Sequence, residues 1–240
     1  MCIVTAAAPR RGTGTTTTLV QLAAALARTG RTVRLLDLDP RRDAAAALGV
    51  PRNHPRWAWT VAERLHVQTD VAPTGPPADF TLIDTEAPDA TADLILWCVE
   101  PVRERIESDR CHVEALRRHA PDARIQPVLL RTDPEAANTS RLRTWCVNHL
   151  PPLPTPVAIP FDPELQAAID RGVTIFEPHW RRPVSPAAEA FSTLARLVLA
   201  PDRTTILNEL DLVLAPSSLD DPGARLLPPL TRRDARRRAG

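Results

Sequence analysis

The sequence predicts an α/β domain whose mostly parallel sheet is doubly wound, with helices on both faces. Three observations predict this fold. Short apolar runs alternate with stretches of helical apolar spacing, a turn rich in glycine and threonine follows the first run, and aspartates follow two later runs. Alternating strands and helices are typical of parallel sheets, and ligands bind such sheets beyond the carboxyl ends of the strands. We therefore expect a ligand site where the turn and the aspartates meet.

The first half of the chain begins with a short buried strand at 2–6, followed by the turn at 9–17. The next segment is expected to be a helix that ends at Gly30, because apolar residues recur at helical spacing. These residues are Leu19, Leu22, Ala23 and Leu26. A second apolar strand is expected at 33–38 and a third at 80–83, directly before Asp84.

The second half continues the alternation of strands and helices. Further buried strands are expected at 94–99, 125–130 and 157–159. A helix at 103–119 carries one apolar stripe, formed by Ile106, Val113 and Leu116, and another helix is marked by Leu142, Trp145 and Cys146. A last helix is expected to start with Ser185 as its N-cap and Pro186 at its first position. Its predicted buried residues are Ala188, Phe191, Ala195 and Val198.

The predicted domain spans residues 1–200, and the character of the chain changes after it. An amphipathic helix is expected at 203–214, and we expect the Pro-rich and then Arg-rich segment 216–240 to be a flexible tail. The arginines of the tail allow two interpretations, a solvated end or a patch that binds DNA phosphates. Glu209 and Asp211 on the polar face of the amphipathic helix argue against binding to an anionic membrane.

Composition excludes several classes of protein. With 240 residues, 43% hydrophobic residues and a net charge of +1, the chain can bury a substantial core and does not have the composition of a disordered protein. No apolar run reaches the ~18–20 residues of a membrane span, and the first residues lack the basic region of a signal peptide. The four cysteines form no CxxC pair and are expected to be reduced core thiols. We therefore expect a cytoplasmic protein.

Some residue types narrow the possible chemistry. All 30 basic residues are arginines, so any mechanism that needs a lysine from this chain is excluded. Six histidines show no spacing typical of zinc ligands. Trp57 and Trp59 flank a Pro- and Arg-rich loop, where they can pack as core or lid residues or stack on a base or a partner.

The turn at 9–17 is the main chemical signal. The backbone N–H groups of a glycine-rich turn converge, and the N-terminus of the next helix adds positive potential, so phosphates bind there. Gly12 and Gly14 allow such a turn, although glycine turns between strands and helices also occur without a ligand. Asp39 and Asp84 lie at strand ends, where carboxylates can hold Mg²⁺ and an attacking water. Asp37 fits either this site or a structural cap.

These segments resemble the ParA-type partition ATPases, the deviant Walker A group that also includes MinD. The turn at 10–17 is similar to the family loop K-G-G-x-G-K-T-T, 37–41 to D-x-D-P-Q, and 82–88 to the Walker B segment I-D-T-P-P. Later segments at 92–95, 157–160 and 185–191 are also similar to family segments, so the resemblance covers about residues 1–200. It implies a P-loop NTPase-like fold and is greatest to the small plasmid-type members.

The resemblance also implies site residues and partners. Thr16, Asp39 and Asp84 would bind Mg²⁺, and Asp39 and Arg10 would be catalytic, with Asp39 positioning the attacking water. ATP would be bound by Arg11, Gly12, Thr13, Gly14, Thr15, Thr16 and Thr17. The family implies a homodimer with nucleotide, non-specific DNA, a ParB-like centromere-binding protein as partner, a nucleoid-associated place in the cytoplasm, and no membrane.

The sequence departs from the family at three loop positions. Thr15 stands at the Walker lysine, Arg10 at the signature lysine, and Arg11 at the first loop glycine. Arg10 can still place a charge on phosphate oxygens, whereas Thr15 cannot replace an ammonium. Glycine at position 11 is expected to supply a conformation that arginine disfavours. The segment after Asp84 is also about a helix shorter than in typical members.

Three functions therefore remain open. The first is an ATPase in DNA partition, most simply of plasmids. The second is a non-hydrolysing scaffold or regulatory protein that has lost ATPase activity, which Thr15 and Arg11 favour. The third is a MinD-like positioning protein, which predicts that the C-terminal segment associates with vesicles.

Overall fold

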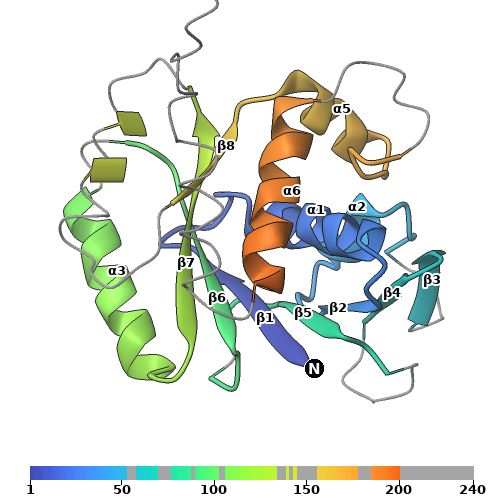
Figure 1. Cartoon of the computed structure of the whole chain (residues 1–240), viewed down its shortest axis with the longest axis horizontal. Helices are drawn as coiled ribbons and strands as arrows, with labels where there is room; N and C mark the ends of the chain where they lie inside the picture. The colour runs from blue at the N-terminus through green and yellow to red at the C-terminus, as the bar shows by residue number, and fades with distance from the viewer. Residues whose placement is uncertain are drawn as a thin grey trace, which may run out of the picture. The chain divides into compact units, whose positions relative to one another are not determined.

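A computed structural model of the chain describes residues 1–52, 58–69, 77–87, 90–102, 106–133, 139–140, 143–144, 156–177 and 185–200. These residues form an eight-stranded sheet in the order β3-β4-β2-β5-β1-β6-β7-β8 (Figure 1). The strands are β1 Cys2–Ala7, β2 Val33–Asp37, β3 Ala58–Ala62, β4 Leu65–Gln68, β5 Phe80–Asp84, β6 Leu94–Val99, β7 Arg124–Thr132 and β8 Val157–Pro160. All neighbouring strands are parallel except the β3–β4 pair. The predicted mostly parallel sheet is confirmed.

Helices cover both faces of the sheet. The described helices are α1 Thr15–Arg28, α2 Asp43–Ala47, α3 Ile106–His119, α5 Pro163–Asp170 and α6 Pro186–Leu199. Figure 1 shows α1 and α6 on one side of the sheet and α3 on the other. Because successive side chains of a strand point to opposite faces, β6 contributes to two cores. Leu94, Leu96 and Cys98 pack with α1 and α6, whereas Ile95, Trp97 and Val99 pack with α3. The doubly wound fold is therefore confirmed.

Side-chain burial follows an apolar stripe in α6, whereas α1 is buried on all sides from Thr18 to Leu26. In α1, Leu19, Leu22, Ala23 and Leu26 are fully buried. In α3, Val113 and Leu116 are buried as expected, whereas the side chain of Ile106 lies outside the described residues. The buried set predicted for α6 is also confirmed: Ala188, Phe191, Ala195 and Val198.

The last helix starts where the sequence predicts. The Ser185 hydroxyl accepts a hydrogen bond from the Ala188 amide at 3.2 Å, so Ser185 is the N-cap and Pro186 the first helical residue. Asp162 lies beside this cap. Its carboxylate accepts hydrogen bonds from the Ser185 hydroxyl and the Ala187 amide, and also from the Glu164 amide at the start of α5. One carboxylate therefore caps two helices behind the end of β8.

Four short elements do not have a clear sequence pattern. The hairpin β3–β4 forms an edge of the sheet, with a register shift between Thr60 and Ala62. Trp59 belongs to β3, and its side chain and Trp57 lie outside the described residues. The helices α2 and α5 contain only five and eight residues. Such lengths are too short for a 3.6-residue period to stand out.

Several predictions fall outside the described residues. These are the helix marked by Leu142, Trp145 and Cys146, the amphipathic helix at 203–214 and the tail at 216–240. The chain divides into the units Met1–Leu199 and Ala200–Gly240, and the site lies in the first. The predicted flexible tail stays a prediction.

The described cysteines differ in their burial. Cys98 is buried, as predicted for a core thiol, whereas Cys2 is half-buried and Cys111 is exposed on α3. The prediction is therefore wrong for Cys111. Within the described residues, none of the helices has the length and apolarity that crossing a membrane requires.

Candidate functional site

The strand order brings the turn and the aspartates together. β5 pairs with both β1 and β2, and Asp37 lies opposite Asp84 in the β2–β5 register. All three strands are parallel, so their carboxyl ends meet at the same edge. The loop 8–14 leaves β1 at this edge, and Asp39 follows β2 by two residues. The Leu38 amide donates to the Asp84 carbonyl at 2.8 Å, which ties the two strand ends together.

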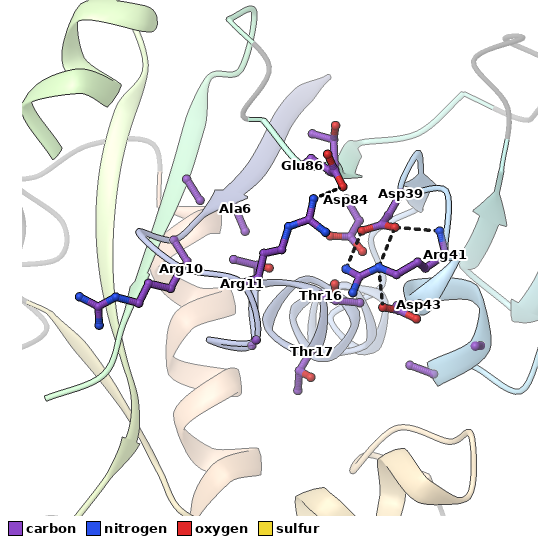
Figure 2. Close-up of a pocket in the computed structure, with 18 of the residues that line it drawn as sticks. Ala6, Arg10, Arg11, Thr16, Thr17, Asp39, Arg41, Asp43, Asp84 and Glu86 are labelled. Atoms are coloured by element: carbon purple, nitrogen blue, oxygen red, sulfur yellow. Dashed lines mark hydrogen bonds and ion pairs between the residues drawn. The ribbon is translucent and has the colours of Figure 1, made fainter. Parts of the chain in front are cut away.

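A cavity of about 570 Å³ lies at this edge (Figure 2). Of the residues expected in the site, it is lined by Arg10, Arg11, Gly12, Gly14, Thr15, Thr16, Thr17, Asp39 and Asp84. Thr13 does not line it. The Thr13 hydroxyl donates to the Arg10 carbonyl at 2.9 Å, and Thr13 lines a smaller neighbouring pocket of about 90 Å³ together with Phe161. Thr13 therefore shapes the loop by this contact.

Two glycines carry the loop into α1. Gly12 has φ +78° and Gly14 φ +106°, values that favour glycine. A Cβ at Gly14 would lie 3.2 Å from Cδ1 of Leu130, so the loop also packs closely there. Among the described residues other than glycine, only Arg42 and Arg131 have positive φ. The expectation that Arg11 occupies a conformation disfavoured by arginine is therefore wrong.

The N-terminus of α1 is open toward the cavity. Its N-cap is Gly14, which has no side chain to cap the helix, and no acidic residue lies in the first turn. The first helical residues Thr15, Thr16 and Thr17 line the cavity. The unpaired amides and the positive end of the helix dipole are therefore available to an anion. No carboxylate from the first turn of α1 competes with that anion.

Asp84 is a buried carboxylate at the end of β5. Burial raises its pKa to about 7; a hydrogen bond from Thr16 lowers the pKa in part, whereas Asp37, Asp39 and Asp43 raise it further. Its Oδ2 atom is buried without a hydrogen-bond partner. A buried, unpaired carboxylate oxygen beside a hydroxyl and other carboxylates has the donor set that Mg²⁺ prefers. Thr16, Asp84 and Asp39 therefore fit a divalent cation.

Asp39 is held by an arginine that the sequence analysis did not single out. The Arg41 guanidinium donates to Oδ1 of Asp39 at 3.2 Å and to Oδ2 at 2.9 Å, and the Arg41 amide donates to Oδ1 at 2.8 Å. The guanidinium beside it lowers the pKa of the Asp39 carboxyl, so Asp39 stays ionised. A bidentate pair also fixes the orientation of the carboxylate. Asp39 is thus ready as an anion but occupied.

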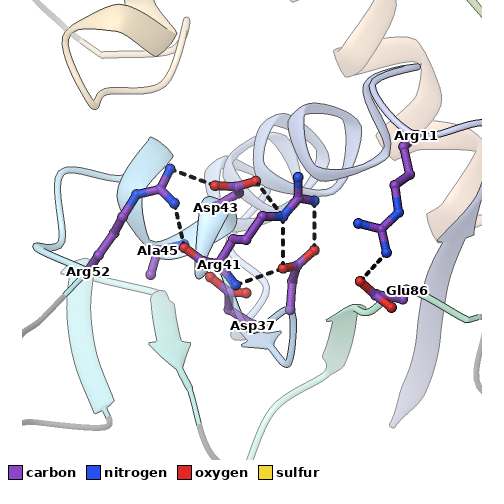
Figure 3. A network of polar contacts seen from close by, with 8 residues as sticks. Arg11, Asp37, Arg41, Asp43, Ala45, Arg52 and Glu86 are labelled. Carbon is purple, nitrogen blue, oxygen red and sulfur yellow. Dashed lines mark hydrogen bonds and ion pairs between the residues drawn. The ribbon is translucent and has the colours of Figure 1, made fainter.

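Further ion pairs surround the cavity (Figure 3). Arg52 contacts Asp43 at 2.6 Å, and Asp43 also lies 3.5 Å from Nε of Arg41. Arg11 forms an ion pair with Glu86, the second residue after β5. Figure 2 shows Arg11 reaching toward Glu86 and Asp84, whereas Arg10 extends away from the aspartates. The side chains of the two loop arginines therefore point to opposite sides of the loop.

Asp37 has the structural role that the sequence left open. Its Oδ2 accepts a hydrogen bond from the Ala45 amide at 2.8 Å, and it does not line the cavity. Ala45 is in the first turn of α2, so Asp37 caps this short helix from the end of β2. Burial raises the pKa of the Asp37 carboxyl.

Sequence reasoning missed five charged residues that line the cavity: Arg41, Asp43, Arg52, Glu86 and Arg131. Two of them carried a signal. Arg41 departs from the glutamine of D-x-D-P-Q, and Glu86 departs from the first proline of I-D-T-P-P. Arg52 and Arg131 carried none, because only the folded chain brings the segment after α2 and the end of β7 to the cavity. The arrangement can hold an anion on the loop and a cation at Asp84 without any lysine.

Comparison with known proteins gives one family. Residues 4–175 match the CobQ/CobB/MinD/ParA nucleotide binding domain. No curated protein sequence matches the chain at a significant level.

Solved structures share the fold. MinD from Pyrococcus horikoshii, complexed with Mg-ADP, is 18% identical with a TM-score of 0.65, over 86% of this chain and 98% of that one. A protein described as a plasmid partition protein from Borrelia burgdorferi, bound to AMPPNP, is 14% identical with a TM-score of 0.62, over 83% and 99%. Cobyrinic acid a,c-diamide synthase from Mycobacterium smegmatis, with an ATP analogue and magnesium, is 16% identical with a TM-score of 0.60, over 83% and 94%. These similarities show the same fold.

Proposed function

Because the chain belongs to the CobQ/CobB/MinD/ParA family of nucleotide-binding domains, we propose that it binds ATP with Mg²⁺ in the cavity of about 570 Å³. One observation carries this proposal. The uncapped N-terminus of α1 and the buried, unpaired oxygen of Asp84 line the same cavity. The first is suited to phosphate and the second to a cation, and a magnesium nucleotide contains both.

The proposal gives each site residue a role. Gly12 and Gly14 let the backbone approach the phosphates, and the amides of Thr15 and Thr17 donate to them. Thr16, Asp84 and Asp39 would hold Mg²⁺, which supplies charge neutralisation on the phosphates. Asp39 accepts a proton from, or orients, the attacking water. Asp39 is ionised, and its two oxygens are shared with the Arg41 guanidinium.

Arg10 is the proposed second catalytic residue. It is exposed and extends away from the aspartates of its own chain. A guanidinium in that position can bind phosphate oxygens of a second copy when two chains face each other across the nucleotides. We therefore include an ATP-dependent homodimer in the proposal.

The cellular role we propose is DNA partition, most simply of plasmids. Several structures with the same fold are cell-division or partition proteins: four contain MinD and one is described as a plasmid partition protein. On this proposal, the ATP-bound dimer binds DNA without sequence preference, and a ParB-like centromere-binding protein stimulates hydrolysis and release. With a net charge of only +1, DNA affinity must come from a local arginine patch and fall steeply with salt.

A second function is favoured by specific residues. Thr15 supplies no ammonium for the β- and γ-phosphates, and loss of one preorganised charge costs on the order of 10²–10³ in rate. Asp39 is also occupied by Arg41. Both features fit a ParA-like scaffold or regulatory protein that binds nucleotide without hydrolysing it.

One experiment separates these functions. A fluorescent ATP analogue is titrated with Mg²⁺ against the full chain, and phosphate release is then measured with and without plasmid DNA. Micromolar binding with a turnover that Asp39→Ala abolishes supports the ATPase. Binding without turnover under all conditions supports the scaffold, and absence of binding with Mg²⁺ rejects both.

DNA and membranes are tested side by side. In the partition proposal, ATP increases retention of the protein on DNA, and retention falls steeply as salt rises. Co-sedimentation with anionic liposomes instead of DNA would favour a MinD-like positioning protein.

A further inference from the structure

We propose that Arg11 supplies the phosphate-binding charge that the loop lysine supplies elsewhere, and that Glu86 holds Arg11 until the nucleotide displaces it. This inference rests on the proposed nucleotide site. It assigns to one residue of the loop the charge that Thr15 lacks. It also assigns to Glu86 the role of a counter-ion that competes with the phosphates for Arg11.

The position of Arg11 supports the proposal. Arg11 stands in the loop between β1 and α1, lines the cavity and reaches across it toward Glu86 and Asp84 (Figure 2). The guanidinium is close enough to Asp39 to help lower the pKa of that carboxyl. Asp39 and Asp84 are the residues that fit the cation. Arg11 therefore holds its charge where the terminal phosphates of a magnesium nucleotide would lie.

The backbone at Arg11 accommodates the arginine. Positive φ values in this loop occur at Gly12 and Gly14, and Arg11 is not among the described residues of positive φ. An arginine at this position therefore carries no backbone strain. The left-handed conformations that the loop needs are taken by the two glycines that follow, so a long side chain fits at 11 while the amides stay available.

In the ion pair between Arg11 and Glu86, a phosphate can replace the Glu86 carboxylate. The Arg11 and Glu86 side chains are 72% and 54% exposed, and ion pairs between such exposed groups contribute little to stability. A phosphate offers the guanidinium a doubly charged acceptor with bidentate geometry. Arg41 lacks this freedom, because two hydrogen bonds tie its guanidinium to the nearly buried Asp39. Of these two pairs, Arg11–Glu86 is the one that a nucleotide can open at the smaller cost.

The test is a double-mutant cycle read by equilibrium binding of a fluorescent ATP analogue with Mg²⁺. Arg11→Ala should weaken binding about tenfold, and Arg11→Lys less, because the charge is kept. Glu86→Gln should tighten binding about threefold to tenfold in the wild-type background and have no effect in Arg11→Ala. Thr15→Lys should restore binding to Arg11→Ala, since it returns a positive charge to the same cavity from the first residue of α1.

The chain offers a matched control in α3. Arg110 and Glu114 form an exposed ion pair with Nε–Oε1 at 3.1 Å, far along the chain from the loop. Glu114→Gln should leave nucleotide affinity unchanged. Thermal unfolding of the Arg11 and Glu86 variants should match the wild type, because both side chains are exposed.

The outcomes separate this inference from the proposed function. If wild type and Arg11→Ala bind the analogue equally well, Arg11 is not the phosphate ligand, and the nucleotide site stands without it. If Glu86→Gln tightens binding equally in both backgrounds, Glu86 acts only by repelling the nucleotide, and the exchange is wrong. If the wild type binds no analogue with Mg²⁺, the proposed function fails together with the inference.

Discussion

The guanidinium of Arg41 donates hydrogen bonds to both carboxylate oxygens of Asp39, which lies two residues earlier in the chain. The guanidinium distances are 3.2 Å to Oδ1 and 2.9 Å to Oδ2, and the Arg41 amide adds a third hydrogen bond at 2.8 Å. Asp39 is nearly buried, whereas the Arg41 side chain is 55% exposed. The acid proposed to orient water is therefore already satisfied by its own loop. Any water or cation must share its oxygens with an arginine.

Arg41→Gln should release Asp39 and raise the rate of ATP hydrolysis. Glutamine is also the residue at this position in the family segment that 37–41 resembles. The exposed arginine contributes only about 1 kcal/mol, so we expect a gain of about threefold to tenfold in turnover. Phosphate release at saturating ATP and Mg²⁺ measures it.

The control for Arg41→Gln is Arg52→Gln. Arg52 lines the same cavity but contacts Asp43 and not Asp39. This variant removes an equal charge and should not raise turnover. A turnover in Arg41→Gln at or below the wild-type value would show that the Arg41 contact assists Asp39.

Thr15→Lys should increase both nucleotide affinity and turnover. The Thr15 side chain lines the cavity at the first residue of α1, and a lysine there would place an ammonium among the phosphates. The gain in turnover is expected to be on the order of 10²-fold, the usual effect of one preorganised charge. Thr29→Lys, at the exposed far end of α1, is the matched charge control. Equal effects of the two substitutions would mean that general charge, and not position 15, is responsible.

Asp84 predicts how Mg²⁺ binding depends on pH. Its pKa is raised to about 7, mainly by burial, and a cation needs the ionised form. Below that pKa, the gain in nucleotide affinity on adding Mg²⁺ should fall by up to about tenfold per pH unit, because protons compete with the cation. The measurement compares this gain at pH 6 and pH 8. In Asp84→Asn the gain should be small, and its remaining pH dependence reports the titration of the phosphate alone.

The raised pKa of Asp84 also predicts how the stability of the nucleotide-free protein depends on pH. A carboxyl with a raised pKa keeps its proton longer in the folded than in the unfolded chain, so stability falls as pH rises from about 4 to about 7. Above pH 7, Asp84 is ionised in the folded chain, and the whole cost of its buried charge reduces the free energy of unfolding. Asp84→Asn should therefore raise the free energy of unfolding at pH 8, by up to about 4 kcal/mol, and have little effect at pH 4. A variant that is equally stabilised at both pH values would contradict the raised pKa.

The sequence predicted the long elements and the place of the site for clear physical reasons. The buried runs of the parallel strands and the stripe of α6 follow from periodicity, and the strand ends place Asp39 and Asp84 beside the loop. Periodicity does not show which charged side chains form ion pairs with one another. The contact of Arg41 with Asp39 depends on local side-chain geometry, and the contact of Arg11 with Glu86 joins residues 75 apart in the chain. A five-residue helix such as α2 leaves no period to detect.

The contact between Gly172 and Gly49 joins the ends of α2 and α5, which form two walls of the cavity. Ala46 and Ala47 of α2 and Ile169 of α5 line the cavity, and behind them Gly172 lies directly against Gly49. A Cβ at Gly172 would lie 2.9 Å from the Gly49 Cα, where only backbone could move. Gly172→Ala should therefore destabilise the fold by about 2–4 kcal/mol, combining a left-handed φ with a clash.

Gly30→Ala is the matched control for the clash. Gly30 also has a positive φ, +87°, but a Cβ there would meet nothing within 4 Å. It should cost only about 1 kcal/mol, from backbone strain alone. Urea unfolding of both variants measures the difference. Because α2 and α5 must separate to relieve the clash, Gly172→Ala should also weaken binding of the ATP analogue, whereas Gly30→Ala should not. Equal stabilities of the two variants would show that the two helix ends are not held in contact.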